Sequence, residues 1–231
     1  MRQHVLRTKD KIWEECGSYA VENPQCSKGR WRELFAAPDG QEGASSAAAE
    51  ASFDTASAPL YVEIGSGKGQ FITRMAQAHP DRLYLACEGA VNICPRILQK
   101  AQALKLPNLR VITEYIVDPA DYFASGELSG VYLNFSDPWP KDRHAHRRLT
   151  HVKKLLQYKA MMAPGTTLEF KTDNDPLFDF SLEQAALAGL ETAFVTRDLH
   201  ASPLAAENIT TEYEDKFAAT GKSINYMKIV F

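Results

Sequence analysis

A glycine-rich turn at residues 65–69 is the feature of this sequence that most constrains its fold. The run before it, residues 60–64, mixes β-branched and aromatic residues and predicts a strand, while apolar residues after the turn recur at helical spacing. The three glycines of the turn, Gly65, Gly67 and Gly69, allow positive φ angles and let a ligand approach the backbone closely. The stretch therefore predicts a strand, a tight ligand-binding turn and a helix.

The residues around the glycines narrow the class of ligand. Gln70 stands where a dinucleotide fingerprint needs its third glycine, and Val62 stands where a P-loop would need its first. Glu63 would repel a pyrophosphate but would attract a ligand that carries an ammonium and a sulfonium group. These features favour S-adenosylmethionine as the cofactor. The simpler alternative is a glycine turn with two surface carboxylates.

The second of these acids is Glu88, which follows the next apolar run, residues 83–87. A doubly wound fold places at this point the acid that holds a ribose diol. Helix and strand patterns then alternate along the chain, with strands expected at 109–115, 131–135, 167–172, 193–198 and 224–231 and helices at 90–104, 119–123, 151–162 and 176–189. Strands separated by helices indicate a parallel sheet with helices on both faces, so the predicted fold class is α/β.

Composition indicates one domain that spans residues 1–231. The chain has 231 residues, 45% of them hydrophobic, which is enough to bury a sizeable core. It has no long apolar run and no signal peptide, so we expect a cytoplasmic protein without a membrane partner. The four cysteines form no C-x-x-C pair, so a cysteine metal site is not expected. The net charge of −3 argues against a surface that binds nucleic acid over its whole extent, although it leaves room for a local basic patch.

Within that domain we expect a basic N-terminal arm at residues 1–37, a flexible insertion at 38–59 and a catalytic core at 60–231. The basic start of the arm equally fits a solvated terminus. Alanine, serine, glycine and acidic residues dominate the insertion, which favours a linker or a surface loop, although residues 47–51 also fit a turn of helix.

A second cluster of functional residues has the sequence NFSDPWPK and runs from Asn134 to Lys141, directly after the strand pattern at 131–135. Its two prolines stiffen the loop and remove backbone donors, so Asp137 and Trp139 are held in fixed directions. An acid beside a flat aromatic ring can hydrogen-bond the edge of a nucleobase and cover its face. The alternative is a structural turn capped by Asp137, with a tryptophan that only packs.

Residues 141–154, called here the basic cluster, contain six Lys or Arg residues, three His residues and a single acid, Asp142. In an acidic protein such a cluster favours a phosphate-binding surface, and a solvated helix start is the alternative. The histidines lack an acid or a cysteine that would complete a set of metal ligands, so no metal site is predicted.

Over nearly its whole length the chain resembles the bacterial tRNA (guanine-N7)-methyltransferases. The likeness rests on EIGSGKGQF at 63–71, Glu88, LNFSDPWPKxRHxxRRLT at 133–150, FKTD at 170–173 and NITTEYEDKF at 208–217, of which the DPWPKxRHxxRR run is far more specific than any glycine loop. The resemblance implies a Rossmann-like class I methyltransferase fold with an antiparallel C-terminal strand. It also implies methyl transfer from S-adenosylmethionine to N7 of a guanine in the variable loop of tRNA, by a monomer or a homodimer.

The resemblance and the residue patterns together give a set of site residues. The implied catalytic residue is Asp137, whose carboxylate would stabilise positive charge on the guanine ring. The cofactor-side residues are Glu63, Gly65, Gly67, Gly69, Glu88, Tyr115, Asn134 and Asp137. The substrate-side residues are Lys141, Arg143, Arg147, Arg148, Asp173, Thr211, Glu212, Tyr213 and Glu214.

Two departures from the family pattern matter. Tyr115 and Ile116 stand where the family usually has an acid followed by alanine, so Tyr115 would stack on the adenine or bond it through its hydroxyl. The Ala/Ser-rich stretch before Leu60 is also longer than the family pattern. Two other functions fit the residues: methyl transfer to another acceptor, such as an exocyclic amine of a nucleobase, and a non-catalytic RNA-binding module with a vestigial cofactor pocket.

Overall fold

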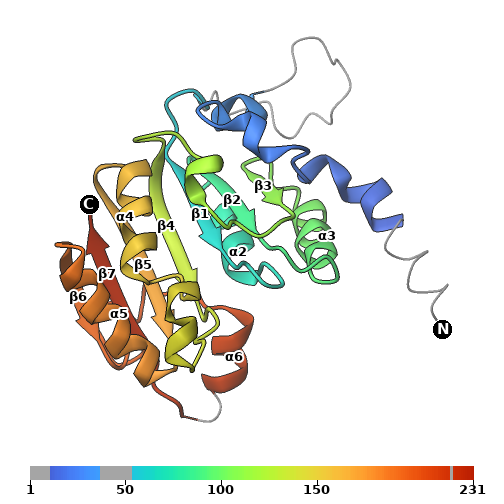
Figure 1. Cartoon of the computed structure of the whole chain (residues 1–231). Coiled ribbons are helices and arrows are strands. Elements are labelled where there is room, and N and C mark those ends of the chain that lie inside the picture. Colours follow the sequence, from blue (N-terminus) through green and yellow to red (C-terminus); the bar gives the residue numbers. More distant parts are fainter. Residues whose placement is uncertain (1–10, 37–53, 219–220) are drawn as a thin grey trace.

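The structure is a computed structural model that describes residues 11–36, 54–218 and 221–231 (Figure 1). The start of the predicted basic arm, residues 1–10, and most of the predicted insertion, residues 38–53, lie outside the described residues.

The described residues form a 7-stranded sheet in the order β3-β2-β1-β4-β5-β7-β6. The strands are β1 (Leu60–Ile64), β2 (Leu83–Cys87), β3 (Leu109–Ile112), β4 (Leu128–Asn134), β5 (Met162–Thr172), β6 (Glu191–Thr196) and β7 (Asn225–Val230). Neighbouring strands from β3 to β5 are parallel, whereas β7 is antiparallel to both β5 and β6. The predicted α/β class, with a mostly parallel sheet and an antiparallel C-terminal strand, is confirmed.

Helices cover both faces of the sheet, as Figure 1 shows. Helices α2 (Gln70–Ala78) and α3 (Cys94–Leu104) pack on one face, and α4 (Val152–Met161) and α5 (Asp175–Leu187) pack on the other. A further helix, α6 (Glu212–Ala218), lies between β6 and β7 in the chain. Short 3-10 turns complete the described elements: η1 (Gly17–Tyr19), η2 (Pro24–Ser27), η3 (Trp31–Phe35), η4 (Pro119–Asp121) and η5 (Asp142–Arg147).

The core is built from strands that are apolar on both faces, as expected where helices cover both sides of a parallel sheet. All five residues of β2 are buried, and their side chains alternate between the two helix layers. The described part of the predicted arm joins this core, because the fully buried ring of Trp31 donates from Nε1 to the carbonyl of Tyr122 at 2.8 Å. The part of the predicted arm around Trp31 is therefore packed on the core.

Element bounds differ from the expected ones at two points near the site. β3 ends at Ile112 rather than near residue 115, which leaves Tyr115 on an exposed loop, and α6 was not expected at all. Within the described residues, no helix has the length and apolar character needed to cross a membrane.

Candidate active site

The predicted glycine turn connects β1 to α2 at the carboxyl edge of the sheet. Its three glycines have positive φ angles: +84° at Gly65, +55° at Gly67 and +77° at Gly69. The N–H groups of Gly65 and Ser66 donate to the carbonyl of Cys87 at the end of β2, which fixes the turn against the neighbouring strand. A Cβ atom on Gly69 would lie 2.8 Å from Cγ2 of Ile97, so this position also needs glycine for space.

Glu63 lies beneath this turn with only 2% of its surface exposed. Its Oε1 accepts a hydrogen bond of 2.8 Å from Nδ2 of Asn134, whereas Oε2 is buried and has no hydrogen-bond partner among the described residues. Burial raises the pKa of Glu63 to about 7, against the opposing effect of the Asn134 bond. An unpartnered buried carboxylate oxygen is a ready acceptor for a cationic ligand group.

Glu88 follows β2 and lies beside the same turn. Its Oε2 accepts from the N–H of Gly67 at 2.9 Å, and its Oε1 accepts from the N–H of Ala90 at 2.8 Å. Each carboxylate oxygen has two lone pairs, so both can accept a further bond from a ligand hydroxyl. Glu88 also lines a cavity of about 480 Å³ whose wall includes Gly65, Tyr115 and Asp137.

The ring of Tyr115 forms one side of this cavity. Tyr115 is 68% exposed, and its ring lies directly against the backbone of Gly89, where an added Cβ atom would come within 2.3 Å of the ring. A flat, exposed ring next to the acid at the end of β2 can stack on another flat group. The geometry is compatible with both roles predicted for Tyr115, stacking on the adenine or bonding it through the hydroxyl, and both stay predictions.

Asp137 is exposed, lines the cavity and belongs to the loop after β4. Two non-glycine residues with left-handed backbone flank it, Phe135 with a φ of +51° and Trp139 with a φ of +43°. Such conformations cost free energy and persist only where surrounding contacts enforce them. The Asp137 loop, residues 135–140, is therefore held in place from outside.

Arg148 supplies one of these outside contacts. Its guanidinium donates from Nε to the carbonyl of Pro138 and from Nη2 to the carbonyl of Trp139, both at 3.0 Å, and lies 4.2 Å from the ring centre of Phe180. Only 9% of Arg148 is exposed. The buried guanidinium of Arg148 thus bonds the Asp137 loop, and the phosphate-binding role predicted for Arg148 stays a prediction.

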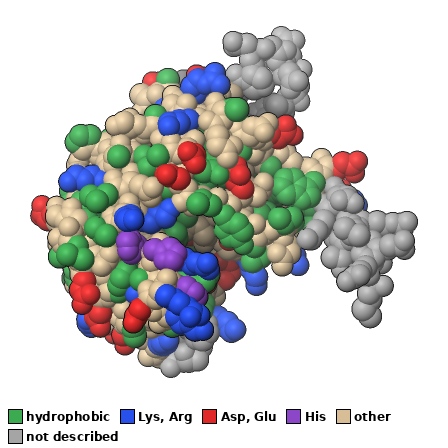
Figure 2. Space-filling model, in the orientation of Figure 1, with side chains coloured by type: hydrophobic (Ala, Val, Ile, Leu, Met, Phe, Trp, Pro, Cys, Tyr) green, Lys and Arg blue, Asp and Glu red, His purple; other side chains and the backbone are tan. Residues whose placement is uncertain are grey.

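The other three substrate-side residues predicted in the basic cluster face solvent. Lys141, Arg143 and Arg147 are exposed, and the guanidinium of Arg147 lies 4.8 Å from the ring centre of Trp139. Figure 2 shows Lys, Arg and His side chains gathered beside a hollow on this side of the molecule. Within the described residues, no group of three or more His, Cys, Asp or Glu side chains could hold a metal ion.

Of the remaining predicted substrate-side residues, Asp173 directly follows β5, Thr211 directly precedes α6, and Glu212, Tyr213 and Glu214 lie in the first turn of α6. Asp173 accepts a bond of 2.9 Å from the hydroxyl of Tyr213 and pairs with Lys222; these bonds outweigh its partial burial and hold its pKa below the ordinary value. Glu212 bonds the N–H of Gln70 at the start of α2 and pairs with Lys100.

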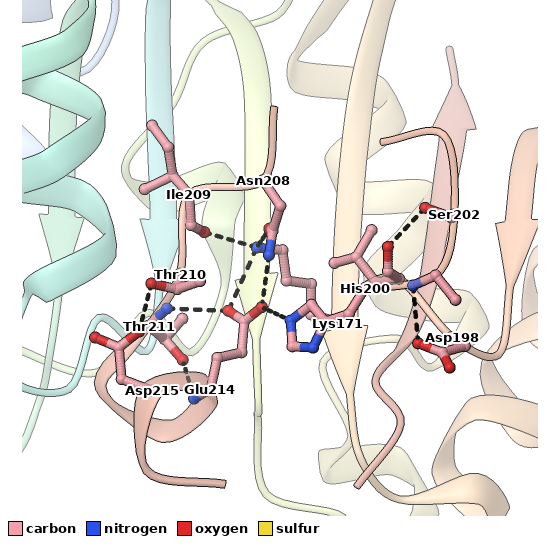
Figure 3. A network of polar contacts seen from close by, with 12 residues as sticks. Lys171, Asp198, His200, Ser202, Asn208, Ile209, Thr210, Thr211, Glu214 and Asp215 are labelled. Atoms are coloured by element: carbon pink, nitrogen blue, oxygen red, sulfur yellow. Dashed lines mark hydrogen bonds and ion pairs between the residues drawn. The ribbon is translucent and has the colours of Figure 1, made fainter. Parts of the chain in front are cut away.

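Thr211 and Glu214 lie deeper and are buried. In Figure 3, Glu214 of α6 meets Lys171 of β5 inside the fold, beside Asn208 and Ile209. Sequence reasoning missed Lys171. Its signal was a lysine inside the apolar strand pattern at 167–172, a position where a charge is rarely buried unless it is paired.

Solved structures share this architecture at low sequence identity. The 16S rRNA methyltransferase KamB aligns with a TM-score of 0.56 and 15% identity, covering 74% of this chain and 87% of that one. The 16S rRNA (adenine(1408)-N(1))-methyltransferase from Catenulisporales acidiphilia aligns with a TM-score of 0.52 and 18% identity, covering 76% of this chain and 89% of that one. At these identities the likeness concerns the fold alone.

Sequence comparison is more specific. The model of the family described as "Putative methyltransferase" matches residues 57–227. A tRNA (guanine-N(7)-)-methyltransferase from Lacticaseibacillus casei is 49% identical over 166 residues, which are 72% of this chain and 78% of the relative. One from Listeria monocytogenes is 37% identical over 231 residues, covering 98% of this chain and 99% of the relative. The chain therefore belongs to this methyltransferase family and, within it, to the group of tRNA (guanine-N(7)-)-methyltransferases.

Proposed function

We propose that this chain transfers the methyl group of S-adenosylmethionine to N7 of a guanine in the variable loop of tRNA, giving 7-methylguanosine, and that it does so in the cytoplasm. The observation that carries the proposal is the place of the Asp137 loop. Asp137 lines the same cavity as Glu88, and the exposed part of the basic cluster follows directly in the chain. The carboxylate of Asp137 thus lies between a cavity suited to a cofactor and a surface suited to phosphate groups.

The residues at the carboxyl edge fit S-adenosylmethionine. The unpartnered Oε2 of Glu63 suits the ammonium of the methionine part, and Glu88, with free lone pairs toward a ligand, suits the two ribose hydroxyls. Tyr115 suits the face of the adenine. When bound, the cofactor supplies an electrophilic methyl group on a positively charged sulfur.

Guanine N7 has an in-plane lone pair and no proton, so the reaction needs no general base. The bound cofactor would supply its methyl group to the N7 lone pair, and the electron pair of the S–C bond would stay on sulfur. The positive charge thereby moves to the guanine ring, where the carboxylate of Asp137 stabilises it and holds the ring edge. The adjacent Trp139 covers the face of the base, so catalysis rests on positioning and electrostatics.

The direct test is methylation of unmodified bulk tRNA with methyl-labelled S-adenosylmethionine, followed by digestion and identification of the labelled nucleoside. We expect 7-methylguanosine, and mapping should place it in the variable loop. Label on an exocyclic amine would instead support a different acceptor, and no label despite tight cofactor binding would support a non-catalytic RNA-binding module.

The phosphate-binding role of the basic cluster has a separate test. Replacing Arg143 and Arg147 together by Ala should raise the Kd for tRNA and reduce the slope of log Kd against log salt concentration by about one for each lost phosphate contact. The matched control is Lys105→Ala with Lys159→Ala, which removes the same charge from exposed positions at the opposite edge of the sheet. Equal salt slopes in both double variants would leave the cluster as a solvated surface.

A further inference from the structure

Lys171 is a buried cation that holds one segment of the chain by several bonds at once (Figure 3). It lies in β5, and 4% of its side chain is exposed. Its Nζ donates to Oδ1 of Asn208 at 2.5 Å and to the carbonyl of Ile209 at 2.9 Å, and it pairs with Oε2 of Glu214 at 3.5 Å. All three acceptors belong to the segment 208–214, which enters α6.

Glu214 has no exposed surface, and both of its carboxylate oxygens are engaged inside the fold. Oε1 accepts from Nδ2 of Asn208 at 3.0 Å and lies 3.4 Å from Nε2 of His200, while Oε2 also accepts from the N–H of Thr211 at 3.0 Å. A carboxylate bound in this way is a poor candidate for direct contact with tRNA. It is well placed to fix the backbone of its own segment.

The segment carries Tyr213 to the Asp137 loop. The ring of Tyr213 packs on the ring of Phe135 with centroids 4.7 Å apart, and its hydroxyl bonds Asp173. From the other side, the N–H of Phe135 donates to the backbone carbonyl of Lys171 at 2.9 Å. Lys171 thus restrains Phe135 twice, through its own backbone and through the segment that its side chain holds.

We infer that Lys171 and Glu214 are positioning residues for methyl transfer, which hold Tyr213 against the strained Phe135 and thereby fix Asp137 two residues further on. The inference rests on the proposed function of Asp137. It assigns to Glu214 an internal role and to Lys171 a role that the sequence pattern does not indicate. Both residues would act through the Asp137 loop rather than by contact with the substrate, since their side chains are buried.

The test uses the physics of buried ion pairs. Removing one partner leaves an uncompensated buried charge and destabilises the fold, whereas removing both charges in side chains of similar shape restores much of the lost stability. We therefore compare Lys171→Met, Glu214→Gln and the double variant. The double variant should unfold at a denaturant midpoint closer to that of the wild type than either single variant.

If Lys171 and Glu214 position the Asp137 loop, the double variant should regain stability without regaining methyl-transfer activity. In the double variant we expect single-turnover methylation of tRNA to stay about a hundredfold below wild type, because a small misplacement of a reacting group has this effect. Affinities for S-adenosylmethionine and tRNA should change little, and amide hydrogen exchange at residues 135–139 should be faster. The control is Arg197→Met with Asp179→Asn, which removes an exposed ion pair of 2.5 Å between α5 and the end of β6.

Wild-type turnover in a folded double variant, or unchanged exchange at residues 135–139, would overturn the inference and leave the pair as a purely structural one. If the double variant does not fold, Asn208→Ala replaces it, since this change removes the amide that bonds both partners and keeps the ion pair. Its turnover should fall with cofactor affinity retained, and wild-type turnover would again overturn the inference. Failure of the proposed function is recognised separately, because the wild type itself would then yield no 7-methylguanosine.

Discussion

Replacing Glu63 by Gln should weaken the binding of S-adenosylmethionine with almost no change in shape. The Asn134 amide keeps an acceptor in Oε1 of the new side chain, but a donor, Nε2, takes the place of the unpartnered Oε2. A hydrogen bond to a charged group contributes about 1.5–3 kcal/mol, so we expect the Kd to rise roughly ten- to a hundredfold. Calorimetry at pH 8 measures this directly.

The pH dependence makes the same prediction sharper. Burial raises the pKa of Glu63 to about 7, so the carboxylate is mostly protonated at pH 6 and mostly ionised at pH 8. Because the ligand ammonium prefers the ionised form, wild-type affinity should increase about tenfold over this interval, whereas the affinity of Glu63→Gln should stay flat.

The same rise in pH should lower the stability of the ligand-free protein. A carboxyl whose folded pKa is raised from 4.5 to about 7 contributes stability that is fully present below pH 4.5 and is lost as the pH rises through 7. Glu63→Gln should therefore stabilise the ligand-free protein at pH 8, by at most on the order of 3 kcal/mol, and change little at pH 5. Urea unfolding at the two pH values measures the difference.

The control for both measurements is Glu169→Gln. Glu169 is a partly exposed acid of β5 that lies 3.6 Å from Lys228 and does not line the cavity beside Asp137. Its variant should keep the wild-type affinity for S-adenosylmethionine and the wild-type pH profile. If Glu63→Gln binds the cofactor as tightly as the wild type at pH 8, the ammonium binds elsewhere and the reasoning from the orphaned oxygen is refuted.

Three further substitutions test the rest of the site. Asp137→Asn keeps the shape of the loop but deletes its charge, so kcat should fall by at least about a hundredfold with tRNA affinity little changed; near-normal turnover would remove Asp137 from the catalytic role. Gly69→Ala forces a side chain into a left-handed position against Ile97, and thermal unfolding should show a loss of about 1–2 kcal/mol. Arg148→Ala should lower the melting temperature and kcat while the salt slope of tRNA binding stays at the wild-type value, and a reduced slope would support its predicted phosphate contact.

Local patterns were sufficient to predict the succession of strands along the chain and the turn at Gly65. Glycine spacing and apolar runs depend on short-range structure, which is why they can be read from the sequence. They placed Glu63 and Glu88 at one edge of the sheet, since parallel strands end together there. The predicted end of β3 was wrong. Tyr115 is apolar enough to extend the strand pattern, although its ring lies on an exposed loop.

The roles of the charged residues were harder to predict from the sequence. Arg148 stands in a run of basic residues that suggests exposure, yet its guanidinium is buried among carbonyls of the preceding loop. Lys171 and Glu214 meet only when β5 and the segment before α6 come together in the fold. The partner that a buried charge meets depends on such long-range contacts, which no local spacing encodes.

The place of β7 in the sheet sets the order in which the protein can be completed during synthesis. β7 lies between β5 and β6 although it follows both in the chain, and it is the only described strand that pairs with β6. While the ribosome is still making the residues before β7, strands β1 to β5 can already form a parallel sheet, but β6 has no edge to join. The edge of β5 that later pairs with β7, from Thr167 to Thr172, is then the open edge of a partial sheet. The strand that carries Lys171 therefore stays unpaired along one edge until β7 has been made.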